Sequence, residues 1–139
     1  MRHTGIVVEN LKVMAEFYGL LGFTSQSQAS EHGPFIEQVT GLKNVNLLWI
    51  KMNAPDGSVL ELLKYETPNE IREKIEQPSN QQGVSHMAFT VHDLDRFCDQ
   101  VVQLGGSLVN LPALTKNQQF RVVYCHDVEG NLFEAVEIQ

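Results

Sequence analysis

The sequence predicts a single α+β domain in which one strand–helix–strand–strand–strand unit occurs twice. The first observation is an internal repeat: residues 2–23 align without a gap on residues 85–106, so that His3 falls on His86. A second repeat follows, because Asp56–Glu61 matches Glu129–Glu134. After its first strand, each copy also carries apolar residues at helical spacing. A duplicated unit of this kind predicts two similar modules joined by a linker.

Each copy is expected to open with a strand followed by a helix. Residues 4–8 and 87–91 are short runs of β-branched, aromatic and other apolar residues, which are typical of strands. The helices that follow are identified by their apolar stripes: Leu11, Met14, Ala15, Tyr18 and Leu21 in the first copy, and Leu94, Phe97, Cys98 and Val101 in the second. Asn10 and Asp93 are the expected N-caps. Gly22 and Gly105 are expected to end the helices with a left-handed residue.

The remainder of each copy is predicted to be strand-rich. Residues 45–52 and 58–65 flank a turn, and residues 120–125 and 131–138 flank another, so each pair predicts a hairpin. Weaker patterns suggest earlier strands at residues 24–29 and 107–111. The first copy is longer than the second by residues 30–44, which contain glycines and Pro34; we expect a loop there that covers a cleft.

We place module 1 over about residues 1–66, a linker over 67–83 and module 2 over about 84–139. The start of the linker, Thr67–Glu70, has an N-cap, a first-position proline and a third-position glutamate. This pattern predicts a short helix that reaches about Gln77. The polar residues after Pro78 predict a flexible connector.

Composition excludes several function classes. The formal charge of −7 without a basic run argues against a nucleic-acid or anionic-membrane partner. No apolar run approaches the roughly 20 residues of a membrane span, and no signal peptide precedes the first strand, so a cytoplasmic protein is expected. Cys98 lies on a helical apolar stripe and is expected in the core. Cys125 and His126 are adjacent on a strand and point to opposite faces, so they should not form a nucleophile pair.

Two histidines and two glutamates occupy equivalent places in the two copies: His3, Glu61, His86 and Glu134. Both glutamates have apolar residues on either side, so their strands are expected to be covered on both faces. A buried carboxylate is costly unless its charge is compensated. A metal ion would compensate it, and so would Lys64 or Arg121. If a pseudo-twofold axis relates the copies, the four side chains converge on one divalent ion, with two positions left open. Imidazole and carboxylate ligands suit Ni, Zn, Co, Fe or Mn.

Strand parity also predicts the walls of the cleft around these ligands, because alternate residues share a face. The expected lining residues are Val7, Val59, Leu63, Thr90, Leu132 and Val136, with Trp49 and Phe35 as further contributors. No basic side chain is identified for the mouth of this cleft, which weighs against a glutathione conjugate as substrate. Among the other histidines, His92 and His126 are expected at the surface, whereas His32 could approach a substrate from the long loop.

The chain resembles the vicinal oxygen chelate superfamily, which includes glyoxalase I, methylmalonyl-CoA epimerase, fosfomycin- and bleomycin-resistance proteins and extradiol dioxygenases. The resemblance covers essentially the whole chain, and its motifs are Arg2–Val8, Phe17–Phe23, Pro55–Leu62, Gly83–Phe89 and Asp127–Glu134. Val128 stands where the superfamily more often has proline. The resemblance implies paired βαβββ modules that form a curved mixed sheet around a metal cleft.

Within that superfamily, the presence of Glu61 together with Glu134 resembles the four-ligand glyoxalase I type. Epimerases usually carry glutamine near the Glu61 position, and dioxygenases lack the glutamate there. The resemblance implies a divalent-metal-dependent lyase or isomerase that transfers a proton through a metal-bound enediolate of a small vicinal-oxygen substrate. Glu134 is our first choice for the base and Glu61 the alternative. It also implies a homodimer, with modules that pair within or between chains. A bleomycin-resistance-like binding protein and an acyl-CoA epimerase are the alternative functions.

Overall fold

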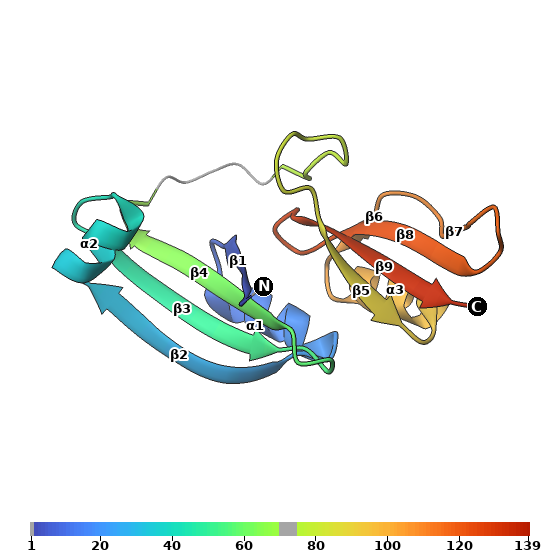
Figure 1. The fold of residues 1–139 in the computed structure, drawn as a ribbon, viewed down its shortest axis with the longest axis horizontal. Helices are drawn as coiled ribbons and strands as arrows, with labels where there is room; N and C mark the ends of the chain where they lie inside the picture. The colour runs from blue at the N-terminus through green and yellow to red at the C-terminus, as the bar shows by residue number, and fades with distance from the viewer. Residues whose placement is uncertain (1, 70–74) are drawn as a thin grey trace. The chain divides into compact units, whose positions relative to one another are not determined.

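The computed structural model describes residues 2–69 and 75–139, and the chain divides into two compact units, Met1–Glu73 and Lys74–Gln139 (Figure 1). Each unit combines helix with a mixed sheet whose first strand is parallel to its last and whose other strands are antiparallel. The predicted α+β class and the repeated βαβββ order are therefore confirmed.

The first unit contains, in chain order, β1 (Thr4–Val7), α1 (Leu11–Leu20), β2 (Thr24–His32), α2 (Pro34–Thr40), β3 (Asn46–Asn53) and β4 (Val59–Thr67). Its strands lie in the order β1-β4-β3-β2. The second unit contains β5 (Met87–Val91), α3 (Leu94–Gln103), β6 (Ser107–Leu108), β7 (Ala113–Leu114), β8 (Phe120–His126) and β9 (Leu132–Ile138). Its order is β5-β9-β8-β6, and β7 also pairs with β8. The weak pattern over residues 107–111 thus corresponds to a strand of only two residues.

The two long helices begin and end as the sequence predicts. Asn10 Oδ1 accepts a hydrogen bond from the Val13 amide at 3.1 Å, and Asp93 Oδ1 accepts one from the Arg96 amide at 3.0 Å. These contacts satisfy amides that the first helical turn leaves without a carbonyl partner. Gly22 follows the end of α1 with a φ of 103°, which a residue with a side chain adopts only under strain.

Each sheet packs one face against its long helix. In the first unit α1 contacts β3 and β4. The buried side chains of this layer include Met14, Phe17, Tyr18, Met52, Leu60 and Leu62. In the second unit α3 contacts β8 and β9, and the buried layer includes Leu94, Phe97, Cys98, Val101, Val123, Cys125, Phe133 and Ala135. Cys98 is in the core, as predicted. Because strand residues alternate, Glu61 and Glu134 lie on the opposite faces of their sheets from these helices.

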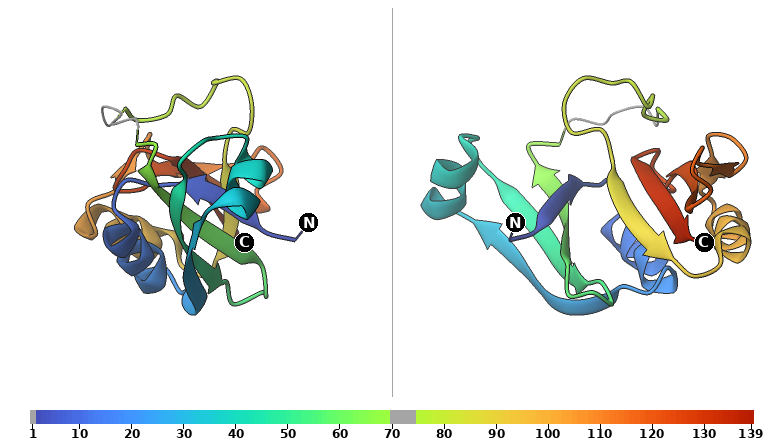
Figure 2. Two further views of the ribbon diagram at one scale, coloured as in Figure 1. Left: turned by 90° about the vertical axis from the view of Figure 1, so that its left-hand side faces the viewer. Right: turned by 45° about the vertical axis from the view of Figure 1, so that its right-hand side comes forward.

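The segment predicted as a long loop is ordered, and that prediction was wrong. β2 continues to His32, and residues 34–40 form α2 at one end of the first sheet (Figures 1 and 2). Pro34 occupies the first turn, where a missing amide proton costs nothing, and Gly41 ends the helix with a φ of 73°. Ile36 packs with Val45 and Leu47, and Leu63 and Tyr65 border this cluster. α2 therefore covers part of the sheet face that carries Glu61.

The linker over residues 67–83 begins differently from the sequence prediction. Thr67, the predicted N-cap of a linker helix, is the last residue of β4, and residues 75–77 are not helical. The rest of the predicted helix, residues 70–74, lies outside the described residues. Among the described helices, none has the length and hydropathy of a membrane span.

Candidate functional site

His3 and Glu61 form a close pair in the first unit. His3 immediately precedes β1, and Glu61 lies on the neighbouring parallel strand β4, opposite Gly5. His3 Nε2 lies 3.1 Å from Glu61 Oε2. The glutamate side chain is 13% exposed and the imidazole 34% exposed. The pair therefore offers one nitrogen and one carboxylate to the open face of the sheet.

The second unit contains an equivalent pair, His86 and Glu134. His86 immediately precedes β5, and Glu134 on β9 lies opposite Ala88, which aligns with Gly5 of the first copy. His86 Nε2 lies 3.6 Å from Glu134 Oε2. The other ring nitrogen, Nδ1, lies 3.1 Å from Ser85 Oγ, and the Tyr124 ring packs against the imidazole at a centroid distance of 4.8 Å. These contacts orient the imidazole, with Nε2 on the side of Glu134.

The donor spacing within each pair suits a shared metal ion. Two ligands at about 2.1 Å from one ion, at right angles to each other, lie about 3 Å apart. The pairs at 3.1 and 3.6 Å are close to that separation. Within the described part of either unit, no third His, Cys, Asp or Glu joins the pair to make an ion-binding group. Each unit by itself thus supplies two of the four predicted ligands.

Lys51 is the cation beside Glu61, and the sequence analysis did not identify it. Its Nζ lies 3.3 Å from Glu61 Oε1, because β3 and β4 place the two residues directly opposite each other. Lys64, one of the two compensating cations that we considered, is an odd number of residues from Glu61 on the same strand, so it points to the opposite face. Both carboxylate oxygens of Glu61 consequently have a partner, since His3 contacts Oε2.

Arg121, the other cation that we considered, serves the helix side of the second sheet. Its guanidinium donates to Asp95 at 2.7 Å and to Glu137 at 3.2 Å. Arg121 thereby lowers the pKa of the Asp95 carboxyl. Glu137 also accepts a hydrogen bond from the Leu94 amide at the start of α3. Arg121 therefore ties β8 to α3 and does not compensate Glu134.

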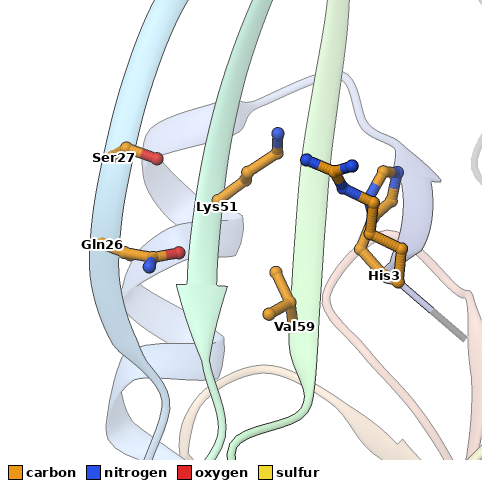
Figure 3. Close-up of a pocket in the computed structure, with 6 residues that line it drawn as sticks. His3, Gln26, Ser27, Lys51 and Val59 are labelled. Atoms are coloured by element: carbon orange, nitrogen blue, oxygen red, sulfur yellow. The ribbon is translucent and has the colours of Figure 1, made fainter.

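A cavity of about 550 Å³ opens beside the first pair, and all of its lining residues belong to the first unit: Arg2, His3, Gln26, Ser27, Lys51 and Val59 (Figure 3). Gln26 and Ser27 enter it together because the pairing of β2 with β3 shifts between Ser25 and Ser27. At such a bulge an extra residue changes the alternation of side chains. Two basic side chains, Arg2 and Lys51, thus line this cavity, whereas the sequence identified no basic residue for the mouth of the cleft.

The predicted cleft residues occupy several environments. Val59 lines the cavity, Leu63 packs beside α2, and the Trp49 ring lies 4.8 Å from Lys51 Nζ. Four others have different exposures: Val7 and Phe35 are 60% and 68% exposed, Thr90 is exposed, and Leu132 is buried. Val136 is half-buried on β9. His32 ends β2 and is exposed, and His92 is exposed as predicted.

His126 was predicted to be solvated, and that prediction was wrong. Its side chain is buried, because the linker passes over it and Nε2 lies 2.9 Å from the Gln77 carbonyl oxygen. Its Nδ1 lies 3.4 Å from Ser107 Oγ and 3.8 Å from a carboxylate oxygen of Glu76. Ser107 in turn donates to Glu76 at 2.6 Å. These contacts attach Glu76 and Gln77 of the linker to the second sheet.

The comparisons with known proteins agree with this architecture. The model of the Glyoxalase/Bleomycin resistance protein/Dioxygenase superfamily matches residues 1–135. A glyoxalase family protein from Bacillus cereus is similar at 30% identity and a TM-score of 0.91, over 99% of this chain and 93% of that one. No match was found among curated proteins.

Two more distant structures share the fold alone. A fosfomycin resistance protein from Listeria monocytogenes, complexed with Mn(II) and a sulfate ion, is 13% identical with a TM-score of 0.61, over 100% of this chain and 92% of that one. A glyoxalase I mutant from Zea mays is 14% identical with a TM-score of 0.67. That match covers 98% of this chain but 44% of the maize chain.

Proposed function

Because the chain belongs to the Glyoxalase/Bleomycin resistance protein/Dioxygenase superfamily, we propose that it is a divalent-metal-dependent lyase or isomerase of the glyoxalase type. Its substrate would be a small molecule with oxygens on neighbouring carbons. One observation carries the proposal: the same His–Glu pair recurs at the same strand register in both units.

The residues that would hold the ion are His3, Glu61, His86 and Glu134. The fosfomycin resistance protein that shares this fold is complexed with Mn(II). The donor set of neutral imidazole and carboxylate fits Ni, Zn, Co, Fe or Mn. Once bound, such an ion supplies Lewis-acid stabilisation of the negative charge that develops on the substrate oxygens.

Glu134 is the proposed base that moves a proton between neighbouring substrate carbons. General acid–base catalysis requires a carboxylate oxygen that can receive the proton. Oε1 of Glu134 has no hydrogen-bond or ion-pair partner among the described residues, and only Oε2 faces His86. In Glu61, Lys51 contacts Oε1 and His3 contacts Oε2. This difference supports Glu134 as the base and Glu61 as the more firmly held ligand.

A complete site requires a first unit and a second unit, since each carries a single pair. We also propose that the protein forms a homodimer. Two arrangements satisfy this requirement: the two units of one chain, or the first unit of one protomer with the second unit of its partner. Either arrangement gives one four-ligand site per chain.

The proposed function is tested by a substrate screen in heavy water. Protein loaded separately with Ni, Zn, Co or Mn is incubated with hemithioacetals and with acyl-CoA thioesters, and mass spectrometry follows deuterium incorporation at the substrate carbon. Incorporation that needs the metal supports proton transfer. Product formation with hemithioacetals identifies glyoxalase chemistry, and epimerisation of the thioesters identifies the epimerase. The absence of both deuterium incorporation and product formation, with every metal and substrate class, contradicts the proposal.

A second candidate function, a small-molecule binding protein without catalysis, is favoured by one observation. Lys51 compensates the charge of Glu61 at 3.3 Å, so this carboxylate needs no metal ion to be tolerated in a partly buried position. A protein of this kind would bind its ligand in the cavity of the first unit and would gain no metal. Metal analysis of the purified protein separates the two candidates.

A further inference from the structure

We propose that the cavity of the first unit binds an oxyanion, a carboxylate or a phosphoryl group, and that Lys51 and Arg2 are the cations that hold it. This inference rests on the proposed function only in regarding the anion as part of a substrate. The anion-binding site is assigned from the cavity itself. It lies beside His3, so it would place the anionic group of a ligand next to the proposed reacting centre.

Two contacts hold Lys51 in position at the cavity. Its side chain is 29% exposed, its Nζ lies 3.3 Å from Glu61 Oε1, and the same atom lies 4.8 Å from the centroid of the Trp49 ring. Two fixed contacts restrict a side chain that is otherwise flexible, which reduces the entropy lost when a ligand binds. An ammonium group has three donors, and Glu61 accepts from one. The remaining donors can serve an anion in the cavity.

The bulge in β2 brings two further hydrogen-bond donors to the cavity. The shift in register after Ser25 sends Gln26 and Ser27 toward Lys51, where a regular strand would direct consecutive side chains to opposite faces (Figure 3). The Ser27 hydroxyl and the Gln26 amide are both hydrogen-bond donors. Together with the ammonium of Lys51 and the guanidinium of Arg2, they form a set of donors around one cavity. Arginine and lysine are the side chains that most often bind carboxylate and phosphate.

The charge of the cavity lining also favours an anion. The whole chain has a formal charge of −7, so a nonspecific surface would repel anions. The cavity lining nevertheless contains two cations and no Asp or Glu. Glu61, which contacts both Lys51 and His3, is not among the lining residues. A volume of about 550 Å³ leaves room for an anionic group together with several attached carbon atoms.

The test is an NMR titration of the metal-free protein with inorganic phosphate, methylphosphonate or succinate at constant ionic strength. The backbone amides of Ser27 and Lys51 report on the cavity. The indole N–H is a further probe that needs no assignment, because Trp49 is the one tryptophan in the sequence. We expect saturable shifts of these signals. Saturation by succinate alone identifies a carboxylate site, and saturation by phosphate and methylphosphonate identifies a phosphoryl site. Shifts that do not saturate, or that chloride reproduces, overturn the proposal.

Two variants and a matched control locate the binding. Arg2→Gln alters an exposed side chain outside the core and should weaken binding about tenfold, the usual effect of losing one charged hydrogen bond. Lys51→Met should abolish saturation, whereas Lys51→Arg should retain it. Lys12→Met removes an equal charge from a lysine of α1 that is 85% exposed, and it should change the affinity by less than about twofold. Equal effects of Lys12→Met and Arg2→Gln would overturn the site.

The same titration separates this inference from the proposed function. Anion binding by metal-free protein that never gains a metal would preserve the anion site and refute the metal-dependent enzyme. Metal binding and deuterium incorporation without saturable anion binding would support the metal-dependent enzyme and refute the anion site.

Discussion

His3 Nε2 lies 3.1 Å from Glu61 Oε2, across two parallel strands that pair Gly5 with Glu61. This relationship recurs in the second unit at 3.6 Å, between His86 and Glu134. In each unit the histidine stands two residues before the position that faces the glutamate, and this offset places both side chains on the same face of the sheet. The two halves of the internal repeat thus share one local geometry, and that geometry suits a cation.

Replacing the proposed base should separate catalysis from metal binding. Glu134→Gln keeps a side-chain oxygen near His86 but cannot accept the proton, so solvent deuterium incorporation should fall by about 100-fold or more while most of the metal is retained. Glu61→Gln should lower the metal content more than Glu134→Gln does, since Glu61 is held on both oxygens.

The matched control for this pair is Glu16→Gln, which alters an exposed glutamate of α1 that is 63% accessible. It should leave exchange and metal content unchanged. Undiminished deuterium incorporation in Glu134→Gln would reject Glu134 as the base.

Mixing two inactive variants distinguishes the two arrangements of modules. His3→Ala breaks the pair of every first unit, and His86→Ala breaks that of every second unit. If sites combine units from different protomers, a mixed dimer contains one intact site, so mixing the variants should restore activity. If sites combine the units of one chain, every site in the mixture lacks one histidine. Activity is measured after the variants are mixed and allowed to exchange subunits, and a tagged pull-down confirms that mixed dimers form.

Much of this fold is encoded locally and could be predicted. Asn10 and Gly22 bound α1 through interactions within a few residues, and the hairpin turns are equally local. α2 could not be predicted in this way. It is a helix of seven residues, too short to be stable alone, and it depends on packing Ile36 against Val45 and Leu47.

In the candidate site, too, some residues could be predicted from the sequence and others could not. The His–Glu pairs are visible in the sequence because the repeat shows them twice. Lys51 was missed because its importance depends on strand register. Lys51 and Glu61 are each three residues from the turn at residues 54–58, so regular hairpin pairing places them opposite each other. The hairpin register could therefore have predicted this contact. No pattern in the sequence indicated the burial of His126, because Glu76 and Gln77 contact it from a segment distant in the chain.

Asp127 is expected to be a principal stabilising residue of the second unit. It is 1% exposed, and its Oδ1 accepts hydrogen bonds from the amides of Glu129 and Asn131, each at 2.9 Å. Asp127→Ala leaves these amides without their acceptor in a partly buried turn and should lower the free energy of unfolding by about 2–4 kcal/mol. Asp56→Ala is the control, because Asp56 accepts a hydrogen bond from the Ser58 amide in the equivalent turn of the first unit but is exposed. Urea denaturation that showed equal losses for both variants would contradict this assignment.

Both cysteines should be unreactive in the folded protein. Burial disfavours the thiolate and raises the pKa of Cys125 to about 12, and burial also raises the pKa of Cys98. At pH 8 the reactive thiolate is therefore scarcer than in an exposed cysteine, whose pKa is about 8.5. A thiol reagent such as dithionitrobenzoate should titrate 2 thiols per chain in guanidinium and almost none in the native state. Rapid native labelling at pH 8 would show that one of these side chains is accessible.

Metal analysis of protein purified without chelator shows whether the repeated His–Glu pairs bind a divalent metal. We expect about one equivalent of Ni, Zn, Co, Fe or Mn per chain, and a large loss of that metal in His3→Ala and in His86→Ala. The contradicting result is less than roughly a tenth of an equivalent per chain, with none gained when Ni, Zn, Co or Mn is added.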